Sequence, residues 1–192
     1  MRVVRTAIPE VLIIEPDCFA DERGFFMELH HAARYAAAGI SGAFVQDNIS
    51  ASRRGVLRGL HLQHPQSQGK LVTVLHGQVL DVGVDVRVGS PTFGQHVAVT
   101  LDDVSRRQIW LPSGFAHGFL VLSERAEIFY KCDAPYSPAD EIAIRWDDPM
   151  LAIDWGIDHP TLSARDQQAP RLNEIRDLPV YQASSCVSSS PA

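Results

Sequence analysis

Two short segments hold the side chains best suited to proton transfer or ligand binding. The first carries His61, Gln63 and Lys70, and the second carries His117. Histidine exchanges a proton readily near neutral pH and is also a common metal ligand. A protonated lysine can stabilise a developing anion, but it has no lone pair to offer a metal. These residue types therefore allow two kinds of site, a metal centre or a metal-free acid–base site.

The residues around these side chains resemble the two motifs of the cupin superfamily of β-barrels. The usual motifs are G-x5-H-x-H-x3-4-E-x6-G and P-x-G-x2-H, and in this chain Gln63 replaces the second histidine of the first motif. The matching positions are Gly55, His61 and Gly77 in the first motif and Pro112, Gly114 and His117 in the second. The resemblance implies that the two histidines, Gln63 and Lys70 point into one barrel.

This inward set of side chains argues against a bound metal. Divalent ions prefer deprotonated donors, and carboxylates or thiolates add the negative charge they need. The ammonium of Lys70 would repel such an ion. A histidine base beside a fixed cation suits proton removal next to a carbonyl, with the cation stabilising the enolate oxygen. We therefore expect neither metal nor cofactor; a metal-dependent cupin oxygenase is the alternative that metal analysis would test.

Composition and charge limit the class of protein. The 192 residues are 45% hydrophobic and 21% charged, with a net charge of −6, so a general nucleic-acid-binding surface is not expected. No apolar run is long enough for a membrane span or a signal peptide. The three cysteines (Cys18, Cys132 and Cys186) form no CxxC pair, which favours free thiols in the cytoplasm. We expect one domain over residues 1–182 and a disordered serine-rich tail over 183–192.

Most of the chain has the pattern of short strands. Val82, Val84 and Val86 alternate with polar residues or glycine, which is typical of a half-buried strand. Similar runs occupy residues 11–14, 25–28, 71–75, 96–101, 109–111, 118–122, 126–131 and 141–146. One helix is predicted over residues 30–38, ending at Gly39, and a short helical turn near Ser163. The pattern predicts a mainly β sandwich or barrel, which the cupin resemblance narrows to a double-stranded β-helix (jelly-roll) barrel with a few short helices.

A narrower resemblance extends over residues 3–181. Its segments are DERGFFME (21–28), QDNIS (46–50), RGLH (58–61), QGKLV (68–72), DVGVDVR (81–87), SPTFG (90–94), PSGFAHGF (112–119), YK (130–131) and LSARD (162–166). In this order and spacing they resemble the dTDP-4-dehydrorhamnose 3,5-epimerase family. The resemblance implies an isomerase that inverts C3 and C5 of dTDP-4-dehydro-6-deoxy-D-glucose to give dTDP-4-dehydro-L-rhamnose.

The resemblance also implies roles for four catalytic residues. His61 is the expected general base, and Asp166 is the carboxylate that orients its ring and stabilises the imidazolium. Tyr130 is the expected general acid on the opposite face of the sugar, with cross-strand packing as the alternative for this side chain. Lys70 is expected beside the enolate oxygen, with a solvated strand end as its alternative.

A larger set matches the family's substrate-binding positions. Arginines suit a diphosphate because the guanidinium fork is bidentate. Arg23 and Arg58 are expected at the diphosphate, and Gln46, Asp47 and Asn48 form the nucleotide-binding segment. Glu28 and Glu141 match other binding positions. Phe26 and Tyr136 are the candidates for stacking on thymine. Ordinary hydrophobic packing is the alternative for Phe26.

Three further residues complete the expected substrate site. Gln63 lies in the first cupin motif, and His117 is expected to contact the sugar. Arg165 stands where the family commonly has lysine, which keeps the charge but changes the geometry of that contact.

The resemblance implies a homodimer in which N-terminal strands cross to the partner. Arg23, Phe26 and Glu28 would then serve the neighbouring site.

The nearest rival function is a single-carbon epimerase acting on a related dTDP-4-keto-deoxysugar, because such enzymes share the same catalytic residues. A third possibility is a non-catalytic sugar-nucleotide-binding module, although it would be expected to lose some of the four catalytic residues.

Overall fold

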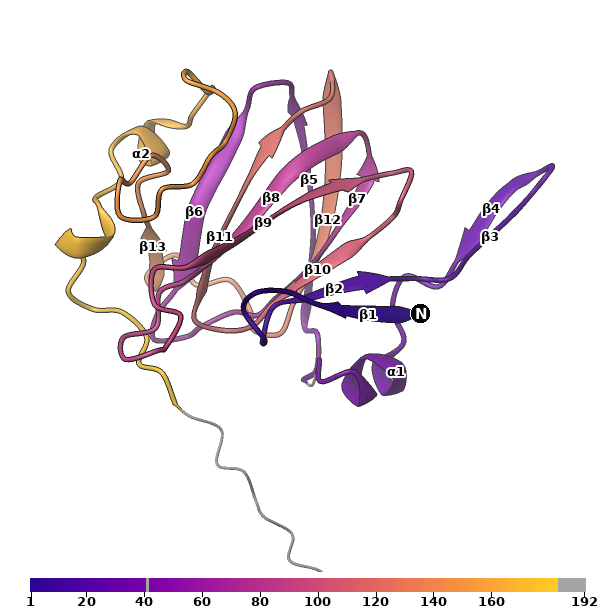
Figure 1. Ribbon diagram of the computed structural model, residues 1–192, viewed down its shortest axis with the longest axis horizontal. Coiled ribbons are helices and arrows are strands. Elements are labelled where there is room, and N and C mark those ends of the chain that lie inside the picture. The colour runs from indigo at the N-terminus through magenta and orange to yellow at the C-terminus, as the bar shows by residue number, and fades with distance from the viewer. Residues whose placement is uncertain (41, 183–192) are drawn as a thin grey trace, which may run out of the picture.

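Two antiparallel sheets face each other in the computed structural model, which describes residues 1–40 and 42–182 (Figure 1). The larger sheet has six strands, in the order β1 (Arg2–Arg5), β2 (Leu12–Glu15), β10 (Gln108–Leu111), β7 (Lys70–His76), β12 (Arg125–Cys132) and β5 (Gln46–Arg53). The smaller has five, in the order β13 (Glu141–Ala143), β6 (Leu57–Gln63), β11 (Phe115–Val121), β8 (Gln78–Asp85) and β9 (His96–Asp102). Neighbours along the sheets are often distant in sequence, as in a jelly roll.

The remaining elements are small. Strands β3 (Cys18–Asp21) and β4 (Gly24–Met27) form a two-stranded hairpin that projects from the body (Figure 1). The helices are α1 (Ala32–Ala37), α2 (Ala164–Gln167) and the 3-10 turn η1 (Leu172–Glu174). None of the described helices is long and apolar enough to cross a membrane.

Apolar side chains form three layers around the sheets. The inner layer fills part of the space between them and includes Val72, Ile128 and Phe119. The C-terminal segment covers the outer face of the smaller sheet, where Trp155 packs over Leu60 and their neighbours. Helix α1 covers part of the outer face of the larger sheet, where its Tyr35 joins one apolar cluster with Leu71 of β7 and Trp110 of β10. Each sheet is therefore buried on its inner face and covered in part on its outer face.

The predicted mainly β fold with few short helices is confirmed, and so are the helix over part of residues 30–38 and the turn that begins at Ser163. Strands β1, β3, β5 and β6 were not predicted as strands. Strand β5 was missed because its inward side chains are polar, so it lacks the apolar alternation of a half-buried strand. The predicted tail lies outside the described residues, and the single domain over 1–182 stays a prediction.

Strands β6 and β11 approach each other closely at the point where they carry the two histidines. His61 and His117 are direct register partners, and the register shifts between His117 and Phe119. Gly59 adopts a φ of +123°, and a Cβ there would lie 2.5 Å from the Cα of Gly118 and 2.8 Å from the carbonyl oxygen of His117. Because both neighbours are backbone atoms, this crossing has no room for a side chain.

Gly59→Ala is therefore expected to destabilise the fold by about 2–4 kcal/mol, since it adds a backbone clash to an unfavourable φ. Gly89→Ala is the matched control, because Gly89 has a φ of +83° but no atom within 4 Å of its Cβ position. The control should lose only about 1 kcal/mol. Urea unfolding of both variants measures the difference, and equal losses would show that close packing at Gly59 is unimportant.

Candidate active site

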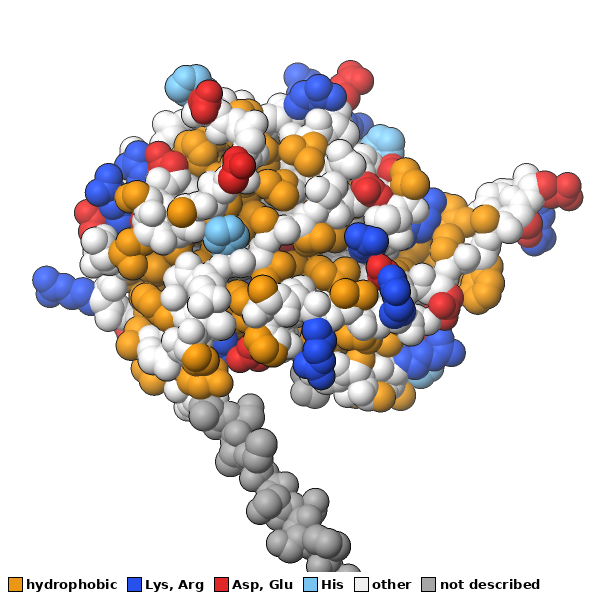
Figure 2. Space-filling model, in the orientation of Figure 1, with side chains coloured by type: hydrophobic (Ala, Val, Ile, Leu, Met, Phe, Trp, Pro, Cys, Tyr) orange, Lys and Arg blue, Asp and Glu red, His pale blue; other side chains and the backbone are white. Residues whose placement is uncertain are grey.

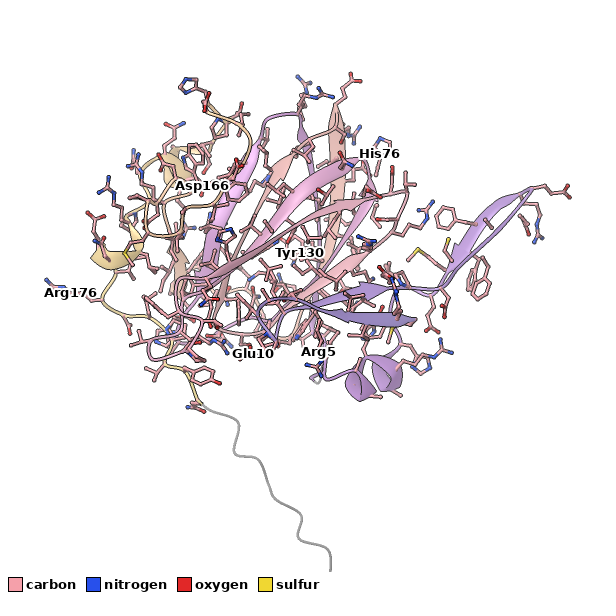
Figure 3. The ribbon with its side chains drawn as sticks, in the orientation of Figure 1. Arg5, Glu10, His76, Tyr130, Asp166 and Arg176 are labelled. Atoms are coloured by element: carbon pink, nitrogen blue, oxygen red, sulfur yellow. The ribbon has the colours of Figure 1, made fainter. Side chains whose placement is uncertain are left out.

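A cavity of about 580 Å³ opens in the space between the two sheets. Its lining includes all four predicted catalytic residues, His61, Lys70, Tyr130 and Asp166. Figure 3 labels two of them, Tyr130 among the strands of the barrel and Asp166 on α2. The strands and α2 thus bring together side chains that are up to 105 residues apart in the sequence.

The shortest contact of this group joins His61 to Asp166. The His61 Nε2 lies 2.6 Å from the Asp166 Oδ1, and the Asp166 side chain is only 3% exposed. Burial acts to raise the pKa of Asp166, but hydrogen bonds from His61 and Ser163 hold it below its ordinary value. An ionised carboxylate only accepts, so Nε2–H donates the bond. The lone pair of His61 is therefore on Nδ1, the nitrogen left free to take a proton.

Lys70 and Tyr130 occupy neighbouring strands of the larger sheet. Burial lowers the pKa of Lys70, although Cys132, Asp133 and Glu141 partly oppose this effect. Within residues 1–40 and 42–182, no carboxylate forms an ion pair with the Lys70 ammonium. Burial also raises the pKa of Tyr130, so its phenol keeps its proton to higher pH than an exposed tyrosine. The cavity therefore contains a lysine amine that is paired with no carboxylate of the described residues, and a protonated phenol.

His117 has a buried carboxylate partner of its own. Its Nε2 lies 2.9 Å from the Oδ2 of Asp81, a residue with no exposed surface. The second carboxylate oxygen of Asp81 has no hydrogen-bond partner among the described residues. The histidines of the two histidine–aspartate pairs thus lie on adjacent strands, β6 and β11, while their aspartates lie on α2 and β8.

The predicted nucleotide-binding residues separate into two groups. Gln46, Asn48 and Arg58 line the cavity, and the Arg58 Nε donates to the Ser52 hydroxyl at 3.1 Å. Asp47 points away from the cavity lining and accepts from the Lys131 ammonium at 2.7 Å. The alternation of a strand explains the separation, since neighbouring residues of β5 face opposite sides of the sheet.

Four more of the predicted residues line the cavity, and a fifth contacts its wall. Gln63, His117, Tyr136 and Glu141 all line the cavity, whereas Arg165 stands behind Glu141 and forms an ion pair with it. Every predicted residue from the body of the chain thus lies in the cavity wall or in contact with it, apart from Asp47.

The three predicted residues of the N-terminal region lie elsewhere. Arg23 is at the tip of the β3–β4 hairpin and pairs with Asp21, while Phe26 is 70% exposed on β4. Glu28 accepts from Arg34 at 2.9 Å. None of the three lines the cavity of its own chain.

Several residues of the site were not predicted, among them Asp81, Gln68 and Ser50. Asp81 carries the signal of a carboxylate between apolar neighbours in a strand, and such a residue needs a buried partner. Gln68 lies in the QGKLV motif, and its Nε2 donates to the carbonyl oxygen of Ala134 at 2.7 Å. Ser50 lines the cavity from β5, and no sequence feature distinguishes it from its neighbours.

The fold and the cavity together define a cupin-type barrel that is equipped for proton transfer. A family model described as dTDP-4-dehydrorhamnose 3,5-epimerase matches residues 5–174, and the chain belongs to this family.

Individual relatives agree with the family. The dTDP-4-dehydrorhamnose 3,5-epimerase of Pseudomonas aeruginosa is 52% identical over 93% of this chain and 100% of that protein. The crystal structure of a dTDP-6-deoxy-D-glucose-3,5-epimerase from Legionella pneumophila, in complex with dTDP-4-keto-L-rhamnose, is 53% identical. It superposes with a TM-score of 0.93 over 95% of this chain and 99% of that one. A dTDP-4-dehydrorhamnose 3-epimerase from Streptomyces niveus is 44% identical over 100% of this chain and 96% of that protein. The predicted fold and family are thereby confirmed.

Replacing the buried cation should stabilise the protein. Lys70 keeps its ordinary pKa in the unfolded chain, so burying the charge opposes folding below the lowered pKa of the folded state. This opposition fades as the pH rises from the folded-state pKa to the unfolded one. Lys70→Met is therefore expected to raise Tm by about 2–5 °C at neutral pH, and by less at alkaline pH.

Lys131→Met is the control, because Lys131 is paired with Asp47 and its removal should not raise Tm. Thermal unfolding of both variants measures the effect. A lower Tm for Lys70→Met would mean that the lysine contributes to stability rather than opposing it.

Proposed function

We propose that this chain inverts C3 and C5 of dTDP-4-dehydro-6-deoxy-D-glucose and so forms dTDP-4-dehydro-L-rhamnose. The observation that carries the proposal is the His61–Asp166 pair in one cavity with Lys70 and Tyr130. A base, a cation and an acid are the three groups that carbon epimerisation next to a ketone needs. Relatives with the 3,5-epimerase name, at about half identity, support the same reaction.

The reaction follows from the acidity of the sugar. Both C3 and C5 flank the C4 ketone, so loss of either proton gives an enolate at C4. The Nδ1 of His61 takes the carbon-bound proton and becomes imidazolium, which ionised Asp166 stabilises. The negative charge on the C4 oxygen is placed beside the Lys70 ammonium. Tyr130 then gives its proton to the opposite face of the carbon, which inverts the centre and regenerates the ketone.

The electrostatics of the cavity fit these roles. The lowered pKa of Asp166 keeps the carboxylate charged, so it accepts from the His61 ring throughout the cycle. The raised pKa of Tyr130 keeps the phenol protonated until the carbanion needs a proton. General acids and bases each contribute about 10²–10⁴-fold, and a preorganised cation adds to this. We assign Arg58 to the diphosphate and Tyr136 to the thymine, because both line the same cavity.

The alternative function is epimerisation at a single carbon. The Streptomyces niveus relative is named a 3-epimerase, so the similarity extends to proteins with that activity. The proposed base, acid and cation would serve one carbon as well as two. What separates the functions is how the sugar turns in the cavity between the two steps.

Solvent exchange distinguishes these functions directly. The enzyme is incubated with dTDP-4-dehydro-6-deoxyglucose in deuterated water, and the ring protons are followed by NMR while a 4-keto reductase traps the product. Deuterium at both C3 and C5, with dTDP-L-rhamnose trapped, is the expected result. Exchange and inversion at one carbon would replace the proposal by the single-carbon function. Absence of exchange, with dTDP still bound, would leave a sugar-nucleotide-binding module.

We also propose that the protein works as a homodimer in the cytoplasm. The β3–β4 hairpin projects into solvent with Phe19 and Phe26, which are 65% and 70% exposed. Figure 2 shows hydrophobic side chains along this projection and charged ones at its tip. Ile49, on the outer face of the larger sheet, is also 67% exposed. Exposed aromatic residues on a strand pair favour burial against a second copy.

The proposed cytoplasmic location rests on the cysteines. Free thiols at Cys18 and Cys132 agree with a reducing compartment.

In this dimer Arg23, Phe26 and Glu28 complete the partner's cavity, and a mixing experiment tests it. Phe26→Ala removes the contribution of the hairpin but leaves its own His61 intact, whereas His61→Asn does the reverse. Each variant alone should be nearly inactive. After mixing and subunit exchange, one complete site forms in each mixed dimer, so about a quarter of the wild-type activity is expected to return.

Mixing two preparations of His61→Asn is the control and should restore no activity. If the mixed variants stay inactive although mass spectrometry detects the mixed dimer, the hairpin does not serve the neighbouring site. A fully active monomer at high dilution would refute the dimer requirement itself.

A further inference from the structure

The loop between β12 and β13 carries Tyr136 and is held by glutamine side chains. Four successive residues of this loop each have a backbone group in such a hydrogen bond. The bonds are Gln68 Nε2 to the Ala134 oxygen (2.7 Å), Gln63 Nε2 to the Pro135 oxygen (3.2 Å), the Tyr136 N–H to Gln46 Oε1 (2.7 Å) and the Ser137 N–H to Gln63 Oε1 (3.0 Å). Because Gln46 comes from β5, Gln63 from β6 and Gln68 from the segment before β7, the loop is fixed to the barrel on several sides.

Gln63 is fully committed to this task. Its amide nitrogen donates to the carbonyl oxygens of Pro135 and Gln66, and its amide oxygen accepts from Ser137. The side chain is buried, with 3% of the residue exposed. Both N–H groups are thus used before any substrate arrives. Gln63 stands where the cupin motif has its second histidine, a metal ligand, but in this chain its side chain binds the loop instead.

The phenol end of Tyr136 is held as well. Its hydroxyl donates to the Glu141 Oε2 at 2.5 Å, and the Arg165 Nη1 donates to the same oxygen. The Arg165 Nη2 donates to the backbone oxygen of Glu141 at 3.2 Å. Burial acts to raise the pKa of Glu141, but these hydrogen bonds keep it below its ordinary value, so the carboxylate stays charged. The guanidinium fork therefore fixes Glu141 at two points, a geometry that one ammonium could not supply in the same way.

The ring between these two ends remains open. Tyr136 is 50% exposed and lines the cavity. A half-exposed aromatic ring that is held at both its backbone and its hydroxyl is prepared for stacking, because little side-chain freedom is lost when a flat ligand binds.

We infer that Gln63 and Arg165 are positioning residues, which hold the Tyr136 ring at the cavity mouth for a nucleobase and do not bind the substrate themselves. The inference rests on the proposed function, which supplies the nucleoside diphosphate. It differs from the expectation that Arg165 binds substrate directly through its charge. The two roles predict different responses to a ligand that lacks phosphates.

Binding of thymidine and of dTDP separates them. Arg165→Met should weaken the binding of both ligands by about tenfold, since both depend on the ring. Tyr136→Phe keeps the ring but loses its hydrogen bond, so it should weaken both to a similar extent. The double variant should be no weaker than either single one, because both act on the same ring. Arg58→Met, at the proposed diphosphate site, is the matched control and should weaken dTDP but not thymidine.

Steady-state kinetics and thermal unfolding complete the test. Arg165→Met should raise KM about tenfold, leave kcat within about threefold and leave Tm nearly unchanged. Arg165→Lys should recover only part of the loss. Gln63→Met removes the hydrogen bonds that hold the loop at Pro135 and Ser137, and it should likewise weaken the binding of both ligands.

Two results would overturn the inference. If Arg165→Met weakens dTDP alone, the arginine binds the diphosphate; if it weakens neither ligand, the contact with Glu141 is incidental. A wild-type protein that binds neither dTDP nor thymidine would instead reject the proposed function, so the two failures are distinguishable.

Discussion

The hydrogen bond between His61 and Asp166 is the contact on which the rest of the site depends. It joins strand β6 to α2 across 105 residues, and the ionised carboxylate, which accepts from Nε2–H, fixes the histidine tautomer that leaves Nδ1 free. The Ser163 hydroxyl accepts from the backbone N–H of Asp166 and so fixes the start of α2. The proposed base is therefore oriented by a segment that is far from it in sequence.

The same strands build both the core and the cavity. Along β7 the inward side chains change from Val74 and Val72 to Lys70, and along β12 they change from Ile128 to Tyr130. One end of the space between the sheets is thus filled with apolar side chains, while the other is left open and lined with polar groups. Burying the Lys70 amine at the polar end opposes folding. The packed apolar end stabilises the fold against this cost and holds the cavity side chains in place. Because Lys70 lies next to this core, burial lowers its pKa, and the same position suits its proposed role beside an enolate.

Features with a strong local signal in the sequence could be predicted, whereas features that depend on the arrangement of distant strands could not. The alternating strand around Val84, the glycine-limited helix and the motif that carries His61 were all found because each has a strong local signal. Strand β5 was missed since it faces the cavity with Gln46, Asn48 and Ser50, whose polarity is typical of a loop. Partnerships such as Asp81 with His117 depend on strand order, which no local pattern contains.

The central claim is that His61 and Tyr130 act on opposite faces of the same carbon. It is tested most directly by Tyr130→Phe in deuterated water, with C3 and C5 followed by NMR. The account predicts that His61 still removes the proton and returns deuterium to the same face, so exchange continues while inversion falls by at least about a hundredfold. Inversion at the wild-type rate would contradict the account, because another group would then supply the second proton.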